Sequence, residues 1–236
     1  MTPEARDLAV VVVASLILAN VLLRALVVAF SPPGRRPLDG PSLPSLVVLG
    51  SGGHTAEMFA ILRALDPRRY APRAYVVADT DHTSVSKVER HEAAVGAALA
   101  DSDATDADLE RWTAHAVLRL PRSREVGQSH ILSVFTTLRA ILAAFALVLR
   151  ERPRVILCNG PGTCLPVCVA AFVAKCLPEA VGRAPVVVYV ESVARVESLS
   201  LTGKLLYHLR LADEVFVQWE TLAGRYPRAK LAGRVV

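Results

Sequence analysis

Short apolar stretches alternate with helical patterns over residues 45–231, and this alternation constrains the fold more than any other feature. Strands separated by helices pair in parallel, because each helix carries the chain back across a face of the sheet. Such strands are predicted at Ser45–Leu49, Ala74–Ala78, Ala116–Leu120, Val155–Cys158, Val186–Val190 and Glu214–Val217, with an extended end after the last helix. The sequence therefore predicts an α/β fold, a Rossmann-like parallel sheet with helices on both faces.

Helical patterns fill the intervals between these strands. They are predicted after the glycine-rich segment to Leu65, and over residues 84–100, 128–150, 163–177, 203–209 and from 220 onward. The acidic run at residues 101–110 is typical of a solvated loop instead. The segment Gln128–Arg150 is too polar in its first half for a membrane span. We interpret it as an amphipathic helix that packs on the core or lies on a membrane.

A long apolar block at residues 8–30 predicts a transmembrane helix. It would extend about 34 Å, slightly more than the roughly 30 Å hydrocarbon layer, and signal peptides have a shorter apolar core. Arginines 24, 35 and 36 flank its C-terminal side, which by the positive-inside rule places the rest of the chain in the cytosol. We expect an anchor at residues 1–30, a Pro/Gly-rich linker at 31–45 and a cytosolic domain at 46–236.

Composition narrows the function classes. The chain has 236 residues, 53% of them hydrophobic, which excludes a disordered protein, and the part after the linker suffices for one large domain only. Its four cysteines include no C-x-x-C pair, so buried reduced thiols are expected; no metal and no cofactor is predicted. Seven arginines lie within residues 116–154 without interleaved aromatic residues, which favours anionic lipid or phosphate over nucleic acid.

The strongest chemical signal is the loop LGSGGHT at residues 49–55, between a strand and a helix. Glycines let the backbone approach an anion, and the N–H groups at the start of a helix donate to it. The loop is neither a dinucleotide fingerprint nor a P-loop, since it lacks the third glycine and the G-K-S/T ending. It predicts a diphosphate site formed by Ser51, Gly52, Gly53 and Thr55, with His54 as a base or phosphate donor. The alternative is a tight turn capped by Thr55 or Ser51.

Two further loops follow strands that end at the same edge of the sheet. Asn159, Gly160 and Gly162 follow the strand Val155–Cys158, and a second glycine loop on one edge predicts a pocket wall. Glu191 and Ser192 follow the buried strand Val186–Val190. Glu191 could bind a ligand hydroxyl or cap a helix, and the sequence leaves both open.

Several motifs in order resemble a known family: LGSGGHTAEM, LPRSREVGQS, LCNGPGTCLPV, VYVESVARVESLSLTGK, VQW and the closing GRVV. They resemble the membrane-anchoring subunit of the dolichol-linked N-acetylglucosaminyltransferase of the endoplasmic reticulum, over roughly residues 46–236. The resemblance implies the acceptor-binding half of a GT-B glycosyltransferase. It also implies a separate soluble partner that binds UDP-GlcNAc and is recruited to the ER membrane. Glu220 departs from the family pattern, which usually has proline there.

The resemblance also implies a reaction and roles for residues. The 4-hydroxyl of GlcNAc-diphosphodolichol would attack the anomeric carbon of UDP-GlcNAc with inversion, and His54 would be the base or orienter. Gly52 and Gly53 would hold the acceptor diphosphate. Arg122 and Arg124 would contact phosphate or anionic headgroups. The acceptor sugar would contact the loop residues Asn159, Gly160, Gly162, Glu191 and Ser192.

Two alternatives remain open at this point. The chain could be a scaffold that recruits its partner and contributes no catalytic residue. It could also be a nucleotide-dependent oxidoreductase, against which the missing third glycine counts. The apolar C-terminal residues Leu231, Val235 and Val236 predict either a partner contact or a last sheet strand.

Overall fold

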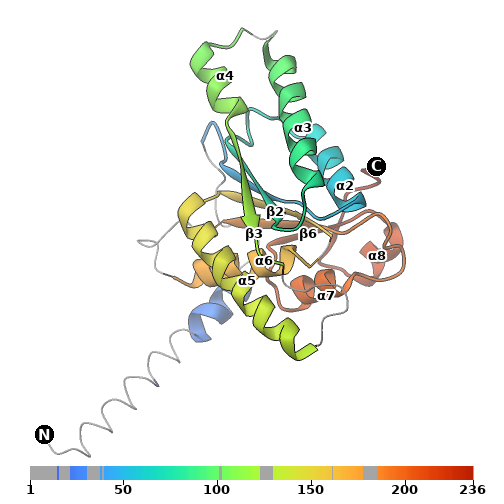
Figure 1. The fold of residues 1–236 in the computed structure, drawn as a ribbon. Helices are drawn as coiled ribbons and strands as arrows, with labels where there is room; N and C mark the ends of the chain where they lie inside the picture. The colour runs from blue at the N-terminus through green and yellow to red at the C-terminus, as the bar shows by residue number, and fades with distance from the viewer. Residues whose placement is uncertain are drawn as a thin grey trace, which may run out of the picture.

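The strands of the described chain form one parallel sheet in a computed structural model (Figure 1). The structure describes residues 15, 22–30, 38, 40–100, 103–122, 130–160, 162–177 and 185–235. The sheet has seven strands in the order β3-β2-β1-β4-β5-β6-β7. They are β1 Ser45–Val48, β2 Arg73–Ala78, β3 His115–Leu120, β4 Val155–Asn159, β5 Val186–Val190, β6 Glu214–Val217 and β7 Lys230–Leu231. All neighbouring pairs are parallel, which confirms the predicted sheet.

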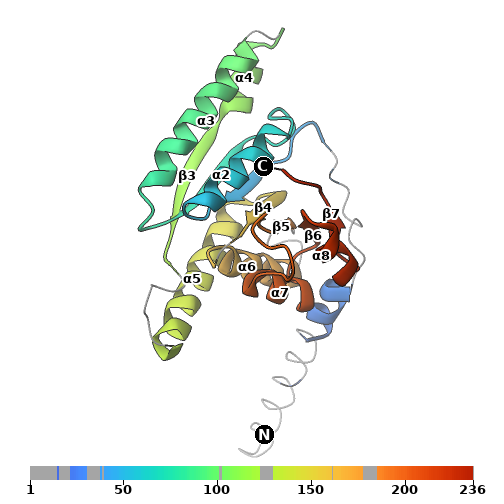
Figure 2. The same ribbon diagram turned by 90° about the vertical axis from the view of Figure 1, so that its right-hand side faces the viewer.

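Helices cover both faces of the sheet, as Figures 1 and 2 show. They are α2 Gly53–Arg63, α3 Thr83–Ala100, α4 Asp106–Thr113, α5 His130–Glu151, α6 Cys164–Cys176, α7 Leu201–His208 and α8 Glu220–Arg225. Leu46 and Val48 of β1 face a core shared with α5 and α6, whereas Val47 faces a second core shared with α2 and α3. Alternate side chains of a strand point to opposite faces, so β1 contributes to both cores.

The strand order reverses at β1, which pairs with β2 on one side and β4 on the other. Val48, the last residue of β1, lies beside Cys158 of β4. The loops that leave β1 and β4 at their carboxyl ends therefore start next to each other. This reversal point is where open parallel sheets bind ligands, and the chain places its two glycine loops there.

The acidic run is partly helical, so the prediction of a loop over residues 101–110 is wrong. Helix α4 begins at Asp106 within that run. Thr105 caps it, since its hydroxyl accepts a hydrogen bond of 3.2 Å from the Asp108 backbone N–H. Asp106 and Asp108 lie in the first turn, where negative charge stabilises a helix. Asp106 and Asp108 contribute to the acidic composition typical of a solvated loop, but in the first turn they also stabilise the start of this helix.

Helix α5 is amphipathic, as predicted. Ala140, Ala144 and Val148 are buried in the core beneath it. Its opposite face carries exposed apolar side chains, namely Val134, Phe135, Leu138 and Leu142. Within the described residues, no helix is both long and apolar enough to cross a membrane.

The predicted anchor and linker lie largely outside the described residues. Of the apolar block, the structure describes residue 15 and residues 22–30, which are helical. Arg24 donates a hydrogen bond of 3.3 Å to the carbonyl of Cys176 in α6. The guanidinium of Arg210 lies 4.4 Å from the centre of the Phe30 ring. These contacts join residues 22–30 to the α6–α7 side of the domain.

The C-terminal end supplies the last strand of the sheet. Leu231 pairs with Val217 in β6, so the strand alternative is confirmed for this residue. The backbone N–H of Val235 donates a 3.0 Å hydrogen bond to the side chain of Gln218. Val236 lies outside the described residues.

The prediction of buried thiols is confirmed for three of the four cysteines. Cys158, Cys164 and Cys168 are buried, and Cys176 is half-buried.

Candidate functional site at the carboxyl edge of the sheet

The first glycine loop leaves the start of α2 open to solvent. Gly52, the residue before the helix, has φ +65°, a conformation that favours glycine. No side chain of the described chain caps this helix, and its first turn holds no acidic residue. A Cβ added at Gly52 or Gly53 would meet nothing within 4 Å. The free N–H groups of the first turn can therefore donate to an anion without obstruction.

Thr55 lies inside this loop and not on its open side. It is fully buried, and its hydroxyl donates to the carbonyl of Gly50. The same oxygen lies 3.1 Å from the Ser84 hydroxyl of α3. Thr55 therefore fixes the loop from within, which differs from its predicted place among the diphosphate ligands. Ser51, Gly52 and Gly53 remain exposed.

His54 joins the two glycine loops. Its ring packs so closely on Gly160 that a Cβ there would lie 2.2 Å from Nδ1. Gly160 also has φ +81°, so glycine is required for both backbone and space. The His54 side chain is 33% exposed, yet its Nδ1 is buried and has no hydrogen-bond partner among the described residues. An unpartnered buried nitrogen beside an open helix start points to a missing ligand or proton partner.

Glu57 connects α2 to the ends of β4 and β5. One of its oxygens, Oε2, accepts a 2.9 Å hydrogen bond from Asn159 Nδ2, and the other, Oε1, accepts a 2.8 Å bond from the Ser192 hydroxyl. Its Oε2 also lies 3.9 Å from His54 Nδ1. Asn159 Oδ1 is buried without a partner in the described part of the chain. Glu57 thus positions Asn159 and Ser192 beside His54.

Glu57 was not among the site residues predicted from the sequence. The available signal was an acid three residues after His54, which places both side chains on one face of α2.

Glu191 supports the loop after β5 through hydrogen bonds. It is fully buried. Its Oε1 accepts from the backbone of Ser192 at 3.0 Å, and its Oε2 accepts from the Ser200 backbone at 2.8 Å and the Ser200 hydroxyl at 3.0 Å. Ser200 in turn caps α7. Both carboxylate oxygens accept hydrogen bonds within the fold, which supports the structural alternative; the contact of Glu191 with the acceptor sugar stays a prediction.

The arginine-rich stretch does not form one patch. Arg119 and Arg122 lie at the carboxyl end of β3, where Arg119 donates a 3.0 Å hydrogen bond to the carbonyl of Asp79. The end of β2 separates them from the glycine loop. Arg152 and Arg154 precede β4 and so lie at the opposite edge. Arg124 lies outside the described residues.

The site combines an open helix start with an imidazole and an amide oxygen that lack partners. Gly162 is exposed next to it in the second loop, whereas Ser192 is buried under Glu57. Over the residues with described placement, no three His, Cys, Asp or Glu side chains group as metal ligands. The arrangement can bind an anion through backbone N–H groups and accept a proton from a neighbouring hydroxyl.

These features define an α/β protein with an uncapped helix start at the carboxyl edge of a parallel sheet, a position where such sheets commonly bind ligands. Residues 45–235 match the family described as oligosaccharide biosynthesis protein Alg14 like. The chain belongs to this family.

Its relatives carry a common name. The chain is 46% identical over 195 residues to the UDP-N-acetylglucosamine transferase subunit ALG14 of Rattus norvegicus, covering 83% of this chain and 84% of the relative. It is 38% identical over 232 residues to the protein of that name from Yarrowia lipolytica. That alignment covers 96% of this chain and 98% of the relative. Both alignments span most of each protein.

One solved structure shows the likeness in fold alone. A putative UDP-N-acetylglucosamine 2-epimerase from Listeria monocytogenes has a TM-score of 0.50 and 13% identity to this chain. The superposition covers 79% of this chain and 42% of the epimerase. The chain therefore has the fold of less than half of that larger protein.

Proposed function

We propose that this chain is the acceptor-binding, membrane-anchoring subunit of a UDP-N-acetylglucosamine transferase. It adds the second GlcNAc to GlcNAc-diphosphodolichol on the cytosolic face of the endoplasmic reticulum, together with a separate soluble subunit that binds UDP-GlcNAc. The observation that carries this proposal is the open start of α2, with the His54 ring against Gly160 at the reversal point of the sheet. The name shared by the relatives supports the reaction.

Each part of the site has a task in this reaction. The N–H groups at Gly53 and the next residues of α2 bind the acceptor diphosphate, since they are free and the helix start is positively polarised. His54 accepts the proton of the attacking 4-hydroxyl as the oxygen bonds to the anomeric carbon and UDP leaves. Asn159 is fully buried and supports the site from within, since its Nδ2 donates to the Glu57 carboxylate next to His54.

The word subunit in the name of the relatives supports a donor site on another polypeptide. The described chain contains one sheet, and the fold likeness covers 42% of the epimerase, as expected if this chain supplies one of two domains. We infer a GT-B arrangement, in which this chain is the acceptor half and the partner the nucleotide half.

Exposed apolar side chains support a membrane contact on one side of the molecule. The helix at residues 22–30 exposes Leu23 and Phe30, and the first half of α5 exposes Phe135 and Leu142. In Figures 1 and 2 both segments lie on the side away from α3 and α4. We infer that the apolar block at residues 8–30 crosses the membrane once and that α5 rests on its surface.

An artificial tether tests the proposal against the scaffold alternative. The soluble subunit that co-purifies with this chain is fused to an unrelated membrane anchor, and transfer to GlcNAc-diphosphodolichol is measured with and without this chain. We expect the tethered subunit alone to be inactive and added chain to restore activity, because the acceptor site is missing without it. Full activity of the tethered subunit alone would contradict an acceptor-binding role.

A further inference from the structure

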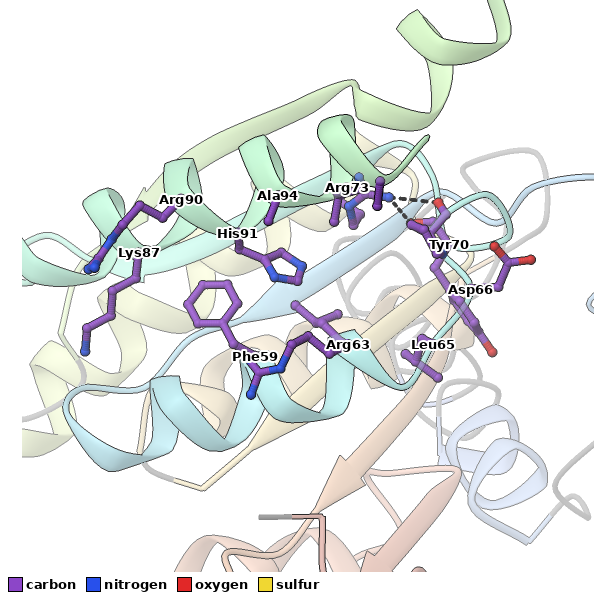
Figure 3. Close-up of a pocket in the computed structure, with 14 residues that line it drawn as sticks. Phe59, Arg63, Leu65, Asp66, Tyr70, Arg73, Lys87, Arg90, His91 and Ala94 are labelled. Atoms are coloured by element: carbon purple, nitrogen blue, oxygen red, sulfur yellow. Dashed lines mark hydrogen bonds between the residues drawn. The ribbon is translucent and has the colours of Figure 1, made fainter. Parts of the chain in front are cut away.

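A cavity of about 510 Å³ lies between α2 and α3, apart from the carboxyl-edge residues described above (Figure 3). Its walls include Phe59 and Leu62 of α2 and Ala94, Val95 and Ala98 of α3. Tyr70 lies toward the end opposite Lys87. None of the residues assigned to the acceptor site lines it. We call it the α2–α3 groove.

Three cations line the groove without carboxylate partners. Lys87 and Arg90 are three residues apart on α3 and extend toward the same end of the groove, while Arg63 comes from α2 beside Phe59 (Figure 3). In the described chain no ion pair joins any of the three to an acid. The one exposed acid of the lining, Asp66, lies near Tyr70 and accepts a 3.0 Å hydrogen bond from the Arg68 backbone.

The floor of the groove is held rigidly. Arg73 donates to both oxygens of Glu92, at 2.7 Å and 2.6 Å, and Tyr75 donates to the same carboxylate. Burial alone would raise the pKa of Glu92, but the hydrogen bonds from Arg73 and Tyr75 hold it below its ordinary value. Because Arg73 and Glu92 neutralise each other, the three cations exceed the single remaining acid of the lining, Asp66.

His91 adds apolar surface to the wall. Its ring centre lies 4.9 Å from that of Phe59. Burial lowers the pKa of His91, so the ring is neutral at pH 7.

We propose that the α2–α3 groove binds a single-chain lipid phosphate, with the aliphatic chain against the α2 and α3 walls and the phosphate at the end lined by Lys87 and Arg90. Apolar walls with cations at one end complement a ligand that has both parts. The volume lies in the range of about 300–1,000 Å³ typical of small-ligand sites. The cations at one end of an otherwise apolar lining favour this ligand over a purely apolar or purely anionic one. The site is independent of the proposed function.

Calorimetric titration of decyl phosphate into the full chain in phosphatidylcholine nanodiscs tests this assignment. Empty nanodiscs correct for partitioning into the bilayer. We expect saturable binding of decyl phosphate, with decanol and inorganic phosphate at least about tenfold weaker, because each lacks one half of the interaction. The double variant Lys87→Glu/Arg90→Glu is expected to bind decyl phosphate at least about tenfold more weakly.

A steric variant with a matched control separates the groove from a general surface effect. Ala94 and Ala97 are both exposed on α3, but only Ala94 lines the groove. Ala94→Trp should abolish binding by filling the groove, and Ala97→Trp should leave it unchanged, with equal thermal unfolding temperatures showing that both fold. Equal binding of inorganic phosphate or decanol, an unaffected Ala94→Trp variant, or no binding to the wild-type chain would each overturn the proposal. If the wild-type chain does not bind decyl phosphate, the groove would have to bind another ligand, such as an acidic helix of a partner protein.

Discussion

The His54→Ala substitution is expected to lower kcat of the reconstituted transferase by about 10²–10⁴-fold, the usual effect of losing a general base. The His54 ring lies at the open start of α2 and packs against Gly160. Steady-state kinetics with a GlcNAc-diphosphate lipid acceptor and UDP-GlcNAc give kcat directly.

His115→Ala is the matched control for this substitution. His115 is an exposed histidine at the start of β3, at the opposite edge of the sheet, and its Nε2 lies 3.5 Å from a Glu89 carboxylate oxygen. Its replacement should leave kcat unchanged. If kcat of the His54→Ala enzyme stays within threefold of the wild-type value, His54 takes no part in the chemical step.

The Gly203→Ala substitution is expected to lower the free energy of unfolding by about 2–4 kcal/mol, since overpacking and lost buried hydrogen bonds combine. A Cβ at Gly203 would lie 2.2 Å from Glu191 Oε2, 3.2 Å from Ser200 Oγ and 3.3 Å from Leu199 Cβ. Glu191 would have to move and release Ser200. For a domain of this size, the expected fall in Tm is roughly 5–10 °C.

Gly224→Ala provides the comparison within α8. A Cβ at Gly224 would meet nothing within 4 Å, so the change should be neutral or raise stability by about 0.5–1 kcal/mol through helix propensity. Thermal unfolding of the two variants in parallel measures the difference. Equal Tm values for both would show that Glu191 is not the rigid support described here.

The sequence predicts the sheet well because each buried parallel strand is a continuous apolar run between loops. Val155–Cys158 and Val186–Val190 illustrate this, and both strands occur in the structure. Helix α4 escaped prediction because Asp106 and Asp108 suggest solvation by composition. Their effect on a helix start depends on the position of Thr105 relative to them.

The sequence predicts the parts of the candidate site that depend on local backbone conformation. It does not predict the contacts between side chains that are far apart in the sequence. The glycine loops were found from the sequence, and Gly52 and Gly160 both have positive φ angles, with the His54 ring packed against Gly160. The contact from Asn159 to Glu57 joins residues 102 positions apart, which no local pattern encodes. Glu191 likewise follows a strand as a ligand would, but its partner Ser200 comes nine residues later and occupies it.

The α2–α3 groove could not be predicted either, because its walls come from two helices whose spacing only the packed domain defines. Phe59 and Val95 each fit an ordinary amphipathic pattern. Both line the cavity because α2 and α3 pack side by side on one face of the sheet.

The central claim is that this chain by itself forms the acceptor site. Binding of a GlcNAc-diphosphate with a short isoprenoid chain to the full chain in nanodiscs, without the soluble partner, tests it most directly. The account predicts saturable binding that is tighter than that of UDP-GlcNAc. It also predicts a loss of at least about tenfold in Gly53→Asp, which places a carboxylate at the open start of α2. Acceptor binding that appears only with the partner present, or that Gly53→Asp leaves intact, would contradict it.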